Sequence, residues 1–323
     1  CPRRTSIMPN YQGVWSLSTQ FQNASGWPEA PFTGNAGLVA GYFTNGASVD
    51  FLNLSSAGNA TDFGDLTVGR YFTSGAGSST RFIAVGGEVS SVSNQTIDFT
   101  TYGSTGTFTD FGDTNVRYSE GNNTPISNGT RSCFTLSVQD GGTTAYNNIS
   151  YITNATTGNA SDFGDTTVAR WTSAGLSSAT RGCIGGGVSY NGSYNFSNVI
   201  DYITIASTGN ATDFGDMTNQ RNQVGGCASS TRGLFCGGNN LNTIDYITIA
   251  STGNATDFGD LPVANYSPVA VSTATLAVIT EGNKGADISQ VTIATTGNAT
   301  DWADLTRTRN RACGGSNSQA SVQ

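Results

Sequence analysis

The feature that most constrains this chain of 323 residues is a short phrase that recurs six times. It is TGNATDFGD around Asp213 and Asp257, and close variants surround Asp62, Asp110 and Asp162. The sixth copy, around Asp301, ends in DWAD, and successive copies are separated by 48, 52, 51, 44 and 44 residues. A period of about 40–50 residues indicates a supersecondary unit that buries its apolar surface against its neighbours. The chain is therefore predicted to fold as one array of similar units.

One unit, residues 221–260, illustrates the internal pattern. It opens with RNQVGGCASSTRGLFCGG, a glycine-punctuated apolar stretch that is typical of a hairpin of two strands. A polar loop follows, and then IDYITIAST, whose alternation predicts a third strand. TGN is a predicted turn, because Gly and Asn tolerate positive φ, and ATDFGDL supplies a short fourth strand. The third strand recurs at 49–54, 97–102, 149–154, 200–205, 244–249 and 288–293.

The two ends of the array complement each other. After the sixth motif the chain supplies a glycine-rich first strand, RACGGSNS, whereas its second strand would begin near residue 320. The phrase NAGLVAGY at 35–42 aligns with that second strand. A blade shared between the two ends closes a ring and removes free sheet edges. We therefore predict an all-β, six-bladed β-propeller over residues 35–323, preceded by an arm over residues 1–34.

The order of residue types within a unit resembles the kelch repeat. In the fifth unit the double glycine is Gly237-Gly238, the tyrosine is Tyr246, and Phe258 with Leu261 stands where kelch has Trp and Leu. The likeness covers about residues 36–320. The phrase as a whole, together with MPNYQGVWSLSTQFQNASGWP, also resembles repeat proteins encoded by tailed phages of aquatic bacteria. Local departures are Arg117 one position early, Asn265 in place of arginine, and Trp302-Ala303 in the sixth motif.

The composition disfavours several classes of function. Charged residues are 11% of the chain, the only lysine is Lys284, and the net charge is −8. Nucleic-acid binding needs clustered Lys and Arg, so none is expected. The chain has no histidine, which removes the commonest general base and the commonest zinc ligand. We expect no catalytic residues, no cofactor and no metal. No run of 18 apolar residues occurs, so membrane insertion is not expected either.

The repeated aspartates admit two interpretations. As structural residues, the first of each motif would cap a turn and the second would pair with one of the recurring arginines. As ligands, they would bind calcium. Repetition in all six units favours the structural interpretation, because a scaffold contact is needed in every blade. Twelve of the 18 aspartates are involved: Asp62, Asp65, Asp110, Asp113, Asp162, Asp165, Asp213, Asp216, Asp257, Asp260, Asp301 and Asp304.

Two enzymatic alternatives remain open. Paired carboxylates could hydrolyse glycosides, although no glutamate recurs beside a unique motif. The TDFGD phrase also resembles the Asp-box turn of sialidase propellers, which implies an arginine triad in a central pocket. Arg81, Arg181 and Arg232 recur at equivalent positions, which is typical of a scaffold.

Five of the six cysteines fall in glycine-rich strand phrases and are expected to be small buried residues. Cys227 and Cys236 flank one hairpin, so a single disulfide between them stays open.

The best candidate for recognition is a loop. The connections after the double glycines vary in length from unit to unit, and variable loops on a rigid scaffold usually carry recognition. The longest, VSYNGSYNFSN, presents Tyr190, Asn191, Tyr194, Asn195 and Phe196, residue types that suit saccharide or protein contact. The alternative is a long solvated loop without a ligand.

The arm over residues 1–34 carries Tyr11, Trp15, Phe21 and Trp27, which are candidates for anchoring to a neighbouring subunit or another protein. Packing beneath the propeller is the alternative. We expect a non-enzymatic protein on the virion surface, associated with tail or capsid, that contacts other virion proteins through the arm and a host glycan or protein through its loops. A homo-oligomer is compatible with this expectation. The alternatives are a secreted or cell-surface bacterial adhesin and a carbohydrate-active propeller enzyme.

Overall fold

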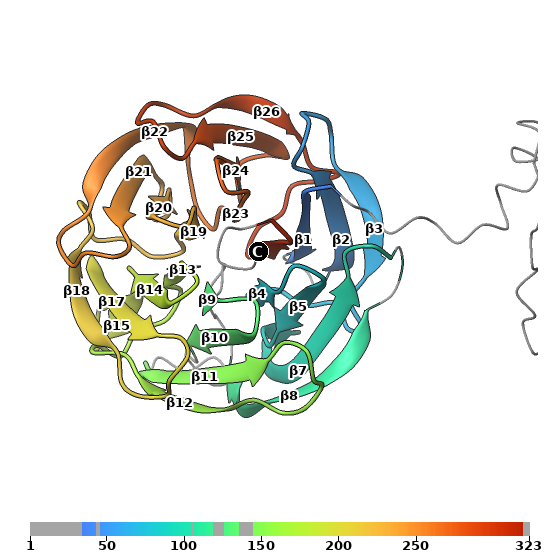
Figure 1. Cartoon of the computed structure of the whole chain (residues 1–323), viewed down its shortest axis with the longest axis horizontal. Helices are drawn as coiled ribbons and strands as arrows, with labels where there is room; N and C mark the ends of the chain where they lie inside the picture. Colours follow the sequence, from blue (N-terminus) through green and yellow to red (C-terminus); the bar gives the residue numbers. More distant parts are fainter. Residues whose placement is uncertain are drawn as a thin grey trace, which may run out of the picture. The chain divides into compact units, whose positions relative to one another are not determined.

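The computed structural model describes residues 34–42, 46–104, 106, 108–118, 126–135 and 145–318. Within these ranges the regular elements are all β-strands. They form six antiparallel sheets arranged as blades around a central axis (Figure 1). The predicted six-bladed β-propeller is therefore confirmed. The ring belongs to the compact unit Phe32–Gln323, and the preceding unit, Cys1–Pro31, lies outside the described residues.

Each blade has four principal strands, a to d from the axis outward. Blade one consists of β27 (Cys313–Ser316), β1 (Ala36–Tyr42), β2 (Gly46–Asn53) and β3 (Thr61–Asp65). Blade two consists of β4 (Ser74–Gly77), β5 (Arg81–Val85), β7 (Val92–Thr101) and β8 (Thr109–Tyr118), with the short β6 (Glu88–Val89) beside β7. Blade three consists of β9 (Ile126–Ser127), β10 (Arg131–Thr135), β11 (Asn148–Thr153) and β12 (Ser161–Asp165).

The second half of the ring follows the same plan. Blade four consists of β13 (Ala174–Ser177), β14 (Arg181–Gly185), β17 (Val199–Thr204) and β18 (Thr212–Asp216), and carries an extra hairpin of β15 (Val188–Tyr190) and β16 (Tyr194–Phe196). Blade five consists of β19 (Gly225–Ala228), β20 (Arg232–Cys236), β21 (Leu241–Thr248) and β22 (Thr256–Asn265). Blade six consists of β23 (Ala270–Ser272), β24 (Leu276–Thr280), β25 (Asp287–Thr292) and β26 (Thr300–Asp304).

The ring closes in blade one. Strand β27 pairs antiparallel with β1, and the register places Cys313 opposite Ala40 and Ser316 opposite Gly37. The strand nearest the axis thus comes from the C-terminal part of the described chain and the other three from its N-terminal part, as predicted. Because every blade has a neighbour on both sides, both faces of each sheet are covered.

The core is divided among the six interfaces between blades. Each hydrophobic cluster mixes residues of two neighbours; Leu234 and Phe258 of blade five, for example, pack with Ala277 and Ile279 of blade six. Strand b is buried along almost its whole length in blades two to six, since only its first residue is half-exposed. This explains the continuous apolar stretches such as RGLFC and LAVIT, because a strand covered on both faces has no polar side to alternate with.

The double glycines follow strand b and let the entering chain approach closely. Gly237 and Gly238 have φ of +58° and +88°, conformations that side chains rarely adopt. A Cβ on Gly87 would lie 2.5 Å from the carbonyl oxygen of Tyr71, in the segment that enters the same blade. The glycines are therefore required by backbone geometry at this end of the blade.

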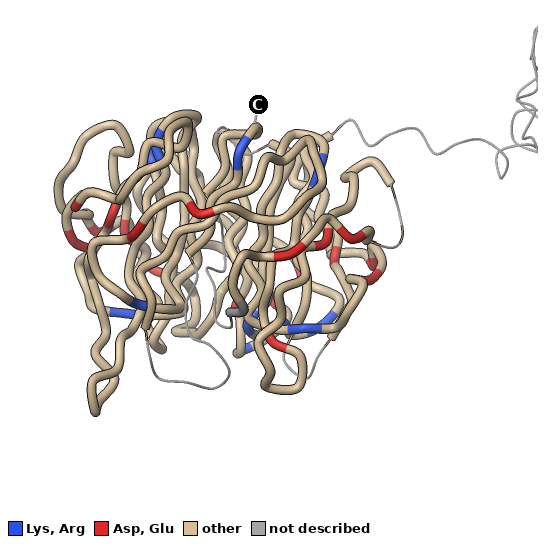
Figure 2. Tube along the Cα trace, turned by 90° about the horizontal axis from the view of Figure 1, so that it is seen from below, with Lys and Arg blue, Asp and Glu red and all other residues tan. Residues whose placement is uncertain are grey.

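Antiparallel order divides the connections between two faces of the ring. The a–b and c–d connections lie on one face, and the b–c connections lie on the other, together with the segments that lead from strand d to the next blade. Figure 2 shows the acidic residues as a belt around the side wall, with basic residues nearer the two faces. We call the face with the b–c connections the b–c face.

Candidate functional site

The repeated phrase forms a clasp between neighbouring blades. In blade five, the backbone N–H groups of Gly253 and Ala255 each donate a 2.7 Å hydrogen bond to the carbonyls of Phe214 and Asp216 in blade four. The Asn254 side chain accepts a 3.0 Å bond from the Asp216 N–H. The TGN turn of one blade thus docks on the DFGD strand of the blade before it. The same asparagine bond recurs from Asp113 to Asn159, Asp165 to Asn210, Asp260 to Asn298 and Asp304 to Asn59.

Glycine occurs on both sides of the clasp, on the strand because two backbones meet there and in the turn because φ is positive, as at Gly253 with φ of +151°. Gly215 has φ of +141°, and a Cβ on it would lie 2.5 Å from the carbonyl oxygen of Gly253. The sixth motif differs, since Ala303 replaces the glycine and lies opposite blade one. There the turn glycine, Gly58, lacks the positive φ that Gly158, Gly209, Gly253 and Gly297 share. The DWAD variant therefore changes the local clasp but keeps the bonds from Asn59 and Ala60 to Asp304.

The structure places the motif aspartates in strand d, on the outer wall of the ring. The first aspartate of each motif is exposed, as for Asp62 and Asp213, and lies in the strand rather than in a turn. The predicted turn cap is therefore wrong. The second aspartate contributes its backbone to the clasp, as described for Asp216. Its predicted ion pair with the recurring arginines is also wrong, because those arginines have other partners.

The partner carboxylates lie in strand c. Arg221 enters blade five and forms a 2.7 Å ion pair with Asp245, and both side chains are fully buried. Thr218 donates a 2.7 Å bond to the same carboxylate. Burial lowers the pKa of Arg221, and Asp245 opposes this shift by favouring the charged guanidinium. Equivalent pairs are Arg70 with Asp98, Arg170 with Asp201 and Arg309 with Asp50.

Both charges of this pair are replaced together in blade six. Ser289 occupies the strand-c position of the aspartate, opposite Asp301 as Asp245 is opposite Asp257. Asn265 stands in the preceding segment where the arginine is expected. In blade three, Ser150 likewise replaces the aspartate and donates a 2.8 Å bond to Asn115. A buried ion with no counter-charge is costly, which explains why the arginine and the aspartate are both replaced in blade six.

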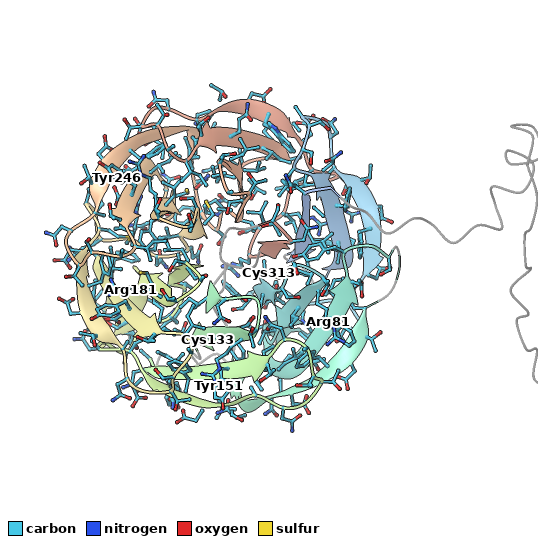
Figure 3. All side chains as sticks on the ribbon, viewed as in Figure 1. Arg81, Cys133, Tyr151, Arg181, Tyr246 and Cys313 are labelled. Carbon is cyan, nitrogen blue, oxygen red and sulfur yellow. The ribbon has the colours of Figure 1, made fainter. Side chains whose placement is uncertain are left out.

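A second set of arginines ties strand b to the next blade. The Arg232 guanidinium lies 4.5 Å from the ring centroid of Tyr246 in its own blade and donates to the carbonyls of Ile293 and Ala294 in blade six. Figure 3 shows the labelled Arg81, Tyr151, Arg181 and Tyr246 in four different blades. Equivalent stacks join Arg81 with Phe99, Arg131 with Tyr151 and Arg181 with Tyr202. These arginines are structural ties and do not converge as a triad.

Five cysteines, Cys133, Cys183, Cys227, Cys236 and Cys313, are buried free thiols, as the sequence predicted. Cys227 and Cys236 lie on neighbouring strands, where Gly225 is opposite Cys236 and Cys227 is opposite Leu234. Their thiols interact, and this contact together with burial raises the pKa of Cys227. In the structure the two residues are therefore neighbouring free thiols.

The predicted recognition loop is the β15–β16 hairpin of blade four, on the b–c face. The register pairs Tyr190 with Tyr194 and Val188 with Phe196, so the three aromatic rings share one face of the hairpin. The Tyr190 and Tyr194 rings pack edge to face with centroids 5.2 Å apart. Tyr194 is 64% exposed. The hairpin therefore presents an aromatic surface to solvent with its rings already in contact.

Amide hydrogen bonds fix the tip of the hairpin. The Asn195 side chain donates a 2.7 Å bond to the side-chain amide oxygen of Asn191 and a 2.9 Å bond to the backbone carbonyl of Ser193. Gly192 has φ of +99°, which the tight turn requires. The two asparagines thus support the turn, and the tyrosines carry the exposed apolar area.

The base of the hairpin is anchored to the ring. Val188 and Trp171 exchange two backbone hydrogen bonds of 2.9 Å, and both side chains are buried together. Ala145, from the b–c connection of blade three, packs against them. The adjacent Tyr146 is 37% exposed. In the parts of the chain that the structure describes, the exposed large aromatic side chains are Tyr146, Tyr190, Tyr194 and Phe196.

Sequence reasoning missed Trp171 and Tyr146. Trp171 precedes strand a of blade four, far in sequence from the loop it anchors, and Tyr146 belongs to another blade. The available signal was the departure of Trp171 from the other units, which have Tyr71 or polar residues near this position.

The candidate anchors Tyr11, Trp15, Phe21 and Trp27 lie outside the described residues. Among the residues that are described, no group of three or more His, Cys, Asp or Glu side chains is placed to hold a metal ion. The same residues contain no helix long and apolar enough to cross a membrane.

Two comparisons with known proteins give no match. No protein-family profile matches the chain. A search of curated proteins finds no significant similarity. The propeller fold is thus established by the structure alone, and the likeness to kelch repeats and to phage proteins stays a prediction.

Proposed function

We propose that this protein is a non-enzymatic binding ring of kelch-like blades on a virion surface, associated with tail or capsid. Its b–c face contacts a host-surface glycan or protein, and its arm contacts other virion proteins. The observation that carries the binding role is the cluster of exposed aromatic residues, Tyr146, Tyr190, Tyr194 and Phe196, on neighbouring connections of blades three and four. Tyrosine supplies a large contact area and a hydroxyl at a small entropic cost.

The contacts of the repeated charged residues also support a binding role over a catalytic one. The strand-b arginines donate to backbone carbonyls of the next blade, and the buried arginines neutralise strand-c aspartates. A sialidase-like site would need arginines that converge on a substrate carboxylate. These guanidinium groups are instead engaged in each interface between blades.

The binding role is tested with two variants of the hairpin. Tyr190→Ser with Tyr194→Ser removes the paired rings and leaves the asparagine bonds of the turn in place, so the ring should stay folded. Asn242→Ser, at the start of strand c directly after the b–c connection of blade five, is a control outside the aromatic cluster. Binding to whole host cells should fall at least about tenfold in the double variant and stay unchanged in the control. Equal binding by all three proteins would contradict the proposal.

The virion assignment is tested by mass spectrometry of density-purified particles from the source culture. We expect the chain to sediment at fixed stoichiometry with a capsid or tail protein. Recovery only in the soluble or cell-envelope fraction would overturn the virion assignment and favour the adhesin, which would use the same aromatic surface.

A further inference from the structure

Four blades share an arginine–aromatic stack that fills the region beside the c–d turn. In these blades the first residue of strand b is an arginine, and it lies over an aromatic ring of strand c. In blade five, Arg232 is opposite Thr248, and Tyr246 is opposite both Leu234 and Thr256. The four stacks have guanidinium-to-centroid distances of 4.3 to 4.7 Å.

Blade six lacks both members of this stack. Leu276 is opposite Thr292, as Arg232 is opposite Thr248. Gln290 is opposite Val278 and Thr300, as Tyr246 is opposite Leu234 and Thr256. Gln290 therefore stands where the other four blades have an aromatic ring, and Leu276 stands where they have the guanidinium group that covers the ring.

A hollow of about 310 Å³ lies at this position of blade six. Gln290 and Thr300 form one side of it, and the c–d turn forms the other. Val291 also borders the hollow, but its side chain is buried in the apolar cluster between blades five and six. This hollow lies on the face opposite the aromatic hairpin, because c–d turns and b–c connections are on different faces. Its polar lining residues are Gln290, Thr292, Thr295, Thr296, Asn298 and Thr300.

The chemistry of the lining indicates the class of ligand. None of the residues that line the hollow carries a charge, so an ionic ligand would find no counter-charge there. Hydroxyl and carboxamide groups both donate and accept hydrogen bonds, which matches a ligand with several adjacent hydroxyls. Ligand pockets start at about 300 Å³, so the volume of this hollow is among the smallest. It therefore suits one small ring rather than a long chain.

The turn that forms the hollow is held in place before any ligand arrives. Gly297 and Ala299 donate 2.8 Å backbone bonds to Phe258 and Asp260 of blade five. The side-chain amide oxygen of Asn298 accepts a 3.0 Å bond from the Asp260 N–H. A preformed site loses little conformational entropy on binding.

We propose that the hollow of blade six binds one neutral sugar residue. Gln290, Thr292 and Thr300 supply hydrogen bonds to its hydroxyls. This site is separate from the aromatic hairpin and does not depend on the function proposed for it.

The test fills the hollow with the stack that four other blades already contain. Ligand-observed saturation-transfer NMR is recorded on the full chain with the methyl glycosides of glucose, galactose, mannose and N-acetylglucosamine. We expect at least one glycoside to bind the native protein. Leu276→Arg with Gln290→Tyr should weaken that binding at least about tenfold, without lowering the melting temperature. Gln290→Met, which removes only the carboxamide, should also weaken it and covers the case in which the double variant does not fold.

The hairpin variant Tyr190→Ser with Tyr194→Ser separates this proposal from the one above. It should leave glycoside binding at the hollow unchanged. Three results would each overturn the proposal: no transfer to any of the four glycosides, equal transfer with the filled variants, or a loss that follows only the hairpin variant.

Discussion

At the scale of single residues, the repeated phrase is determined by backbone contacts. Its glycine, asparagine and alanine meet the strand of the preceding blade through main-chain bonds, as Gly253, Asn254 and Ala255 do. The one side chain of the phrase that takes part is that of the asparagine, which accepts a hydrogen bond from a backbone N–H. The sequence suggested that the aspartate carboxylates form the contacts, whereas in the structure the backbone of the second aspartate forms them.

Gly215→Ala tests this interpretation. The substitution forces a side chain into φ of +141° and places Cβ 2.5 Å from the Gly253 oxygen. We expect the free energy of unfolding to fall by about 1–3 kcal/mol from the backbone strain alone. Gly58→Ala is the control, because a Cβ there has open space. Denaturant unfolding of both variants gives the comparison, and equal stability would show that the close approach is unimportant.

The buried ion pair gives a second prediction at this scale. Asp245→Ser leaves the Arg221 charge buried without its partner and should cost about 3–5 kcal/mol. Arg221→Asn with Asp245→Ser reproduces the neutral pair of blade six and should cost much less than the sum of the single changes. A double-mutant cycle in denaturant measures this difference. Additive effects would mean that the two side chains do not stabilise each other.

At the scale of the strand, closure of the ring depends on β27. Removing residues 313–323 exposes the edge of β1 and uncovers Val269 and Val271 of blade six and Phe82 of blade two, which lie beside Gly314 and Gly315. We expect a large loss of cooperative unfolding and concentration-dependent association, measured by calorimetry and size-exclusion chromatography. A chain ending at Ser318 keeps every described strand and should behave as the full chain. A monomer of normal stability after the longer truncation would contradict the role of β27.

The strand scale is also where the sequence was most informative. The number of blades, the position of strand c and the shared blade follow from a period and from alternation, which local sequence carries directly. The partners of the buried arginines could not be predicted in this way, because three pairs join residues 24–31 apart and the fourth, Arg309 with Asp50, joins residues 259 apart. The sequence did not predict the hollow of blade six, because the hollow arises where Leu276 and Gln290 replace the arginine and the aromatic residue found in four other blades.

At the scale of the whole molecule, the six interfaces enclose the described thiols. Burial raises the pKa of Cys133 and Cys183 to about 12 and that of Cys313 to about 11. Thiols of an unfolded chain ionise near pH 8.5, about 3 units lower than the buried ones. Between these values the native state keeps protons that the unfolded state has lost. The stabilising effect is complete below about pH 8.5 and is lost as the pH rises toward 12.

The prediction is a fall in the denaturant midpoint between pH 7.5 and pH 10, measured anaerobically with reductant present. The variant Cys133→Ala with Cys183→Ala should show a smaller fall over the same interval, because two of the linked protons are removed. Parallel curves for the two proteins would mean that these thiols ionise alike in the folded and unfolded states.

The clasp also affects how the sequence of such a chain can change during evolution. Since each clasp uses nearly the same phrase, one blade presents its neighbour with the same docking edge as another. Recombination between copies could therefore exchange the segments between two phrases, and with them the b–c connections, while the new neighbours still match. The ring would be inherited as a constant frame, and its loops as interchangeable parts.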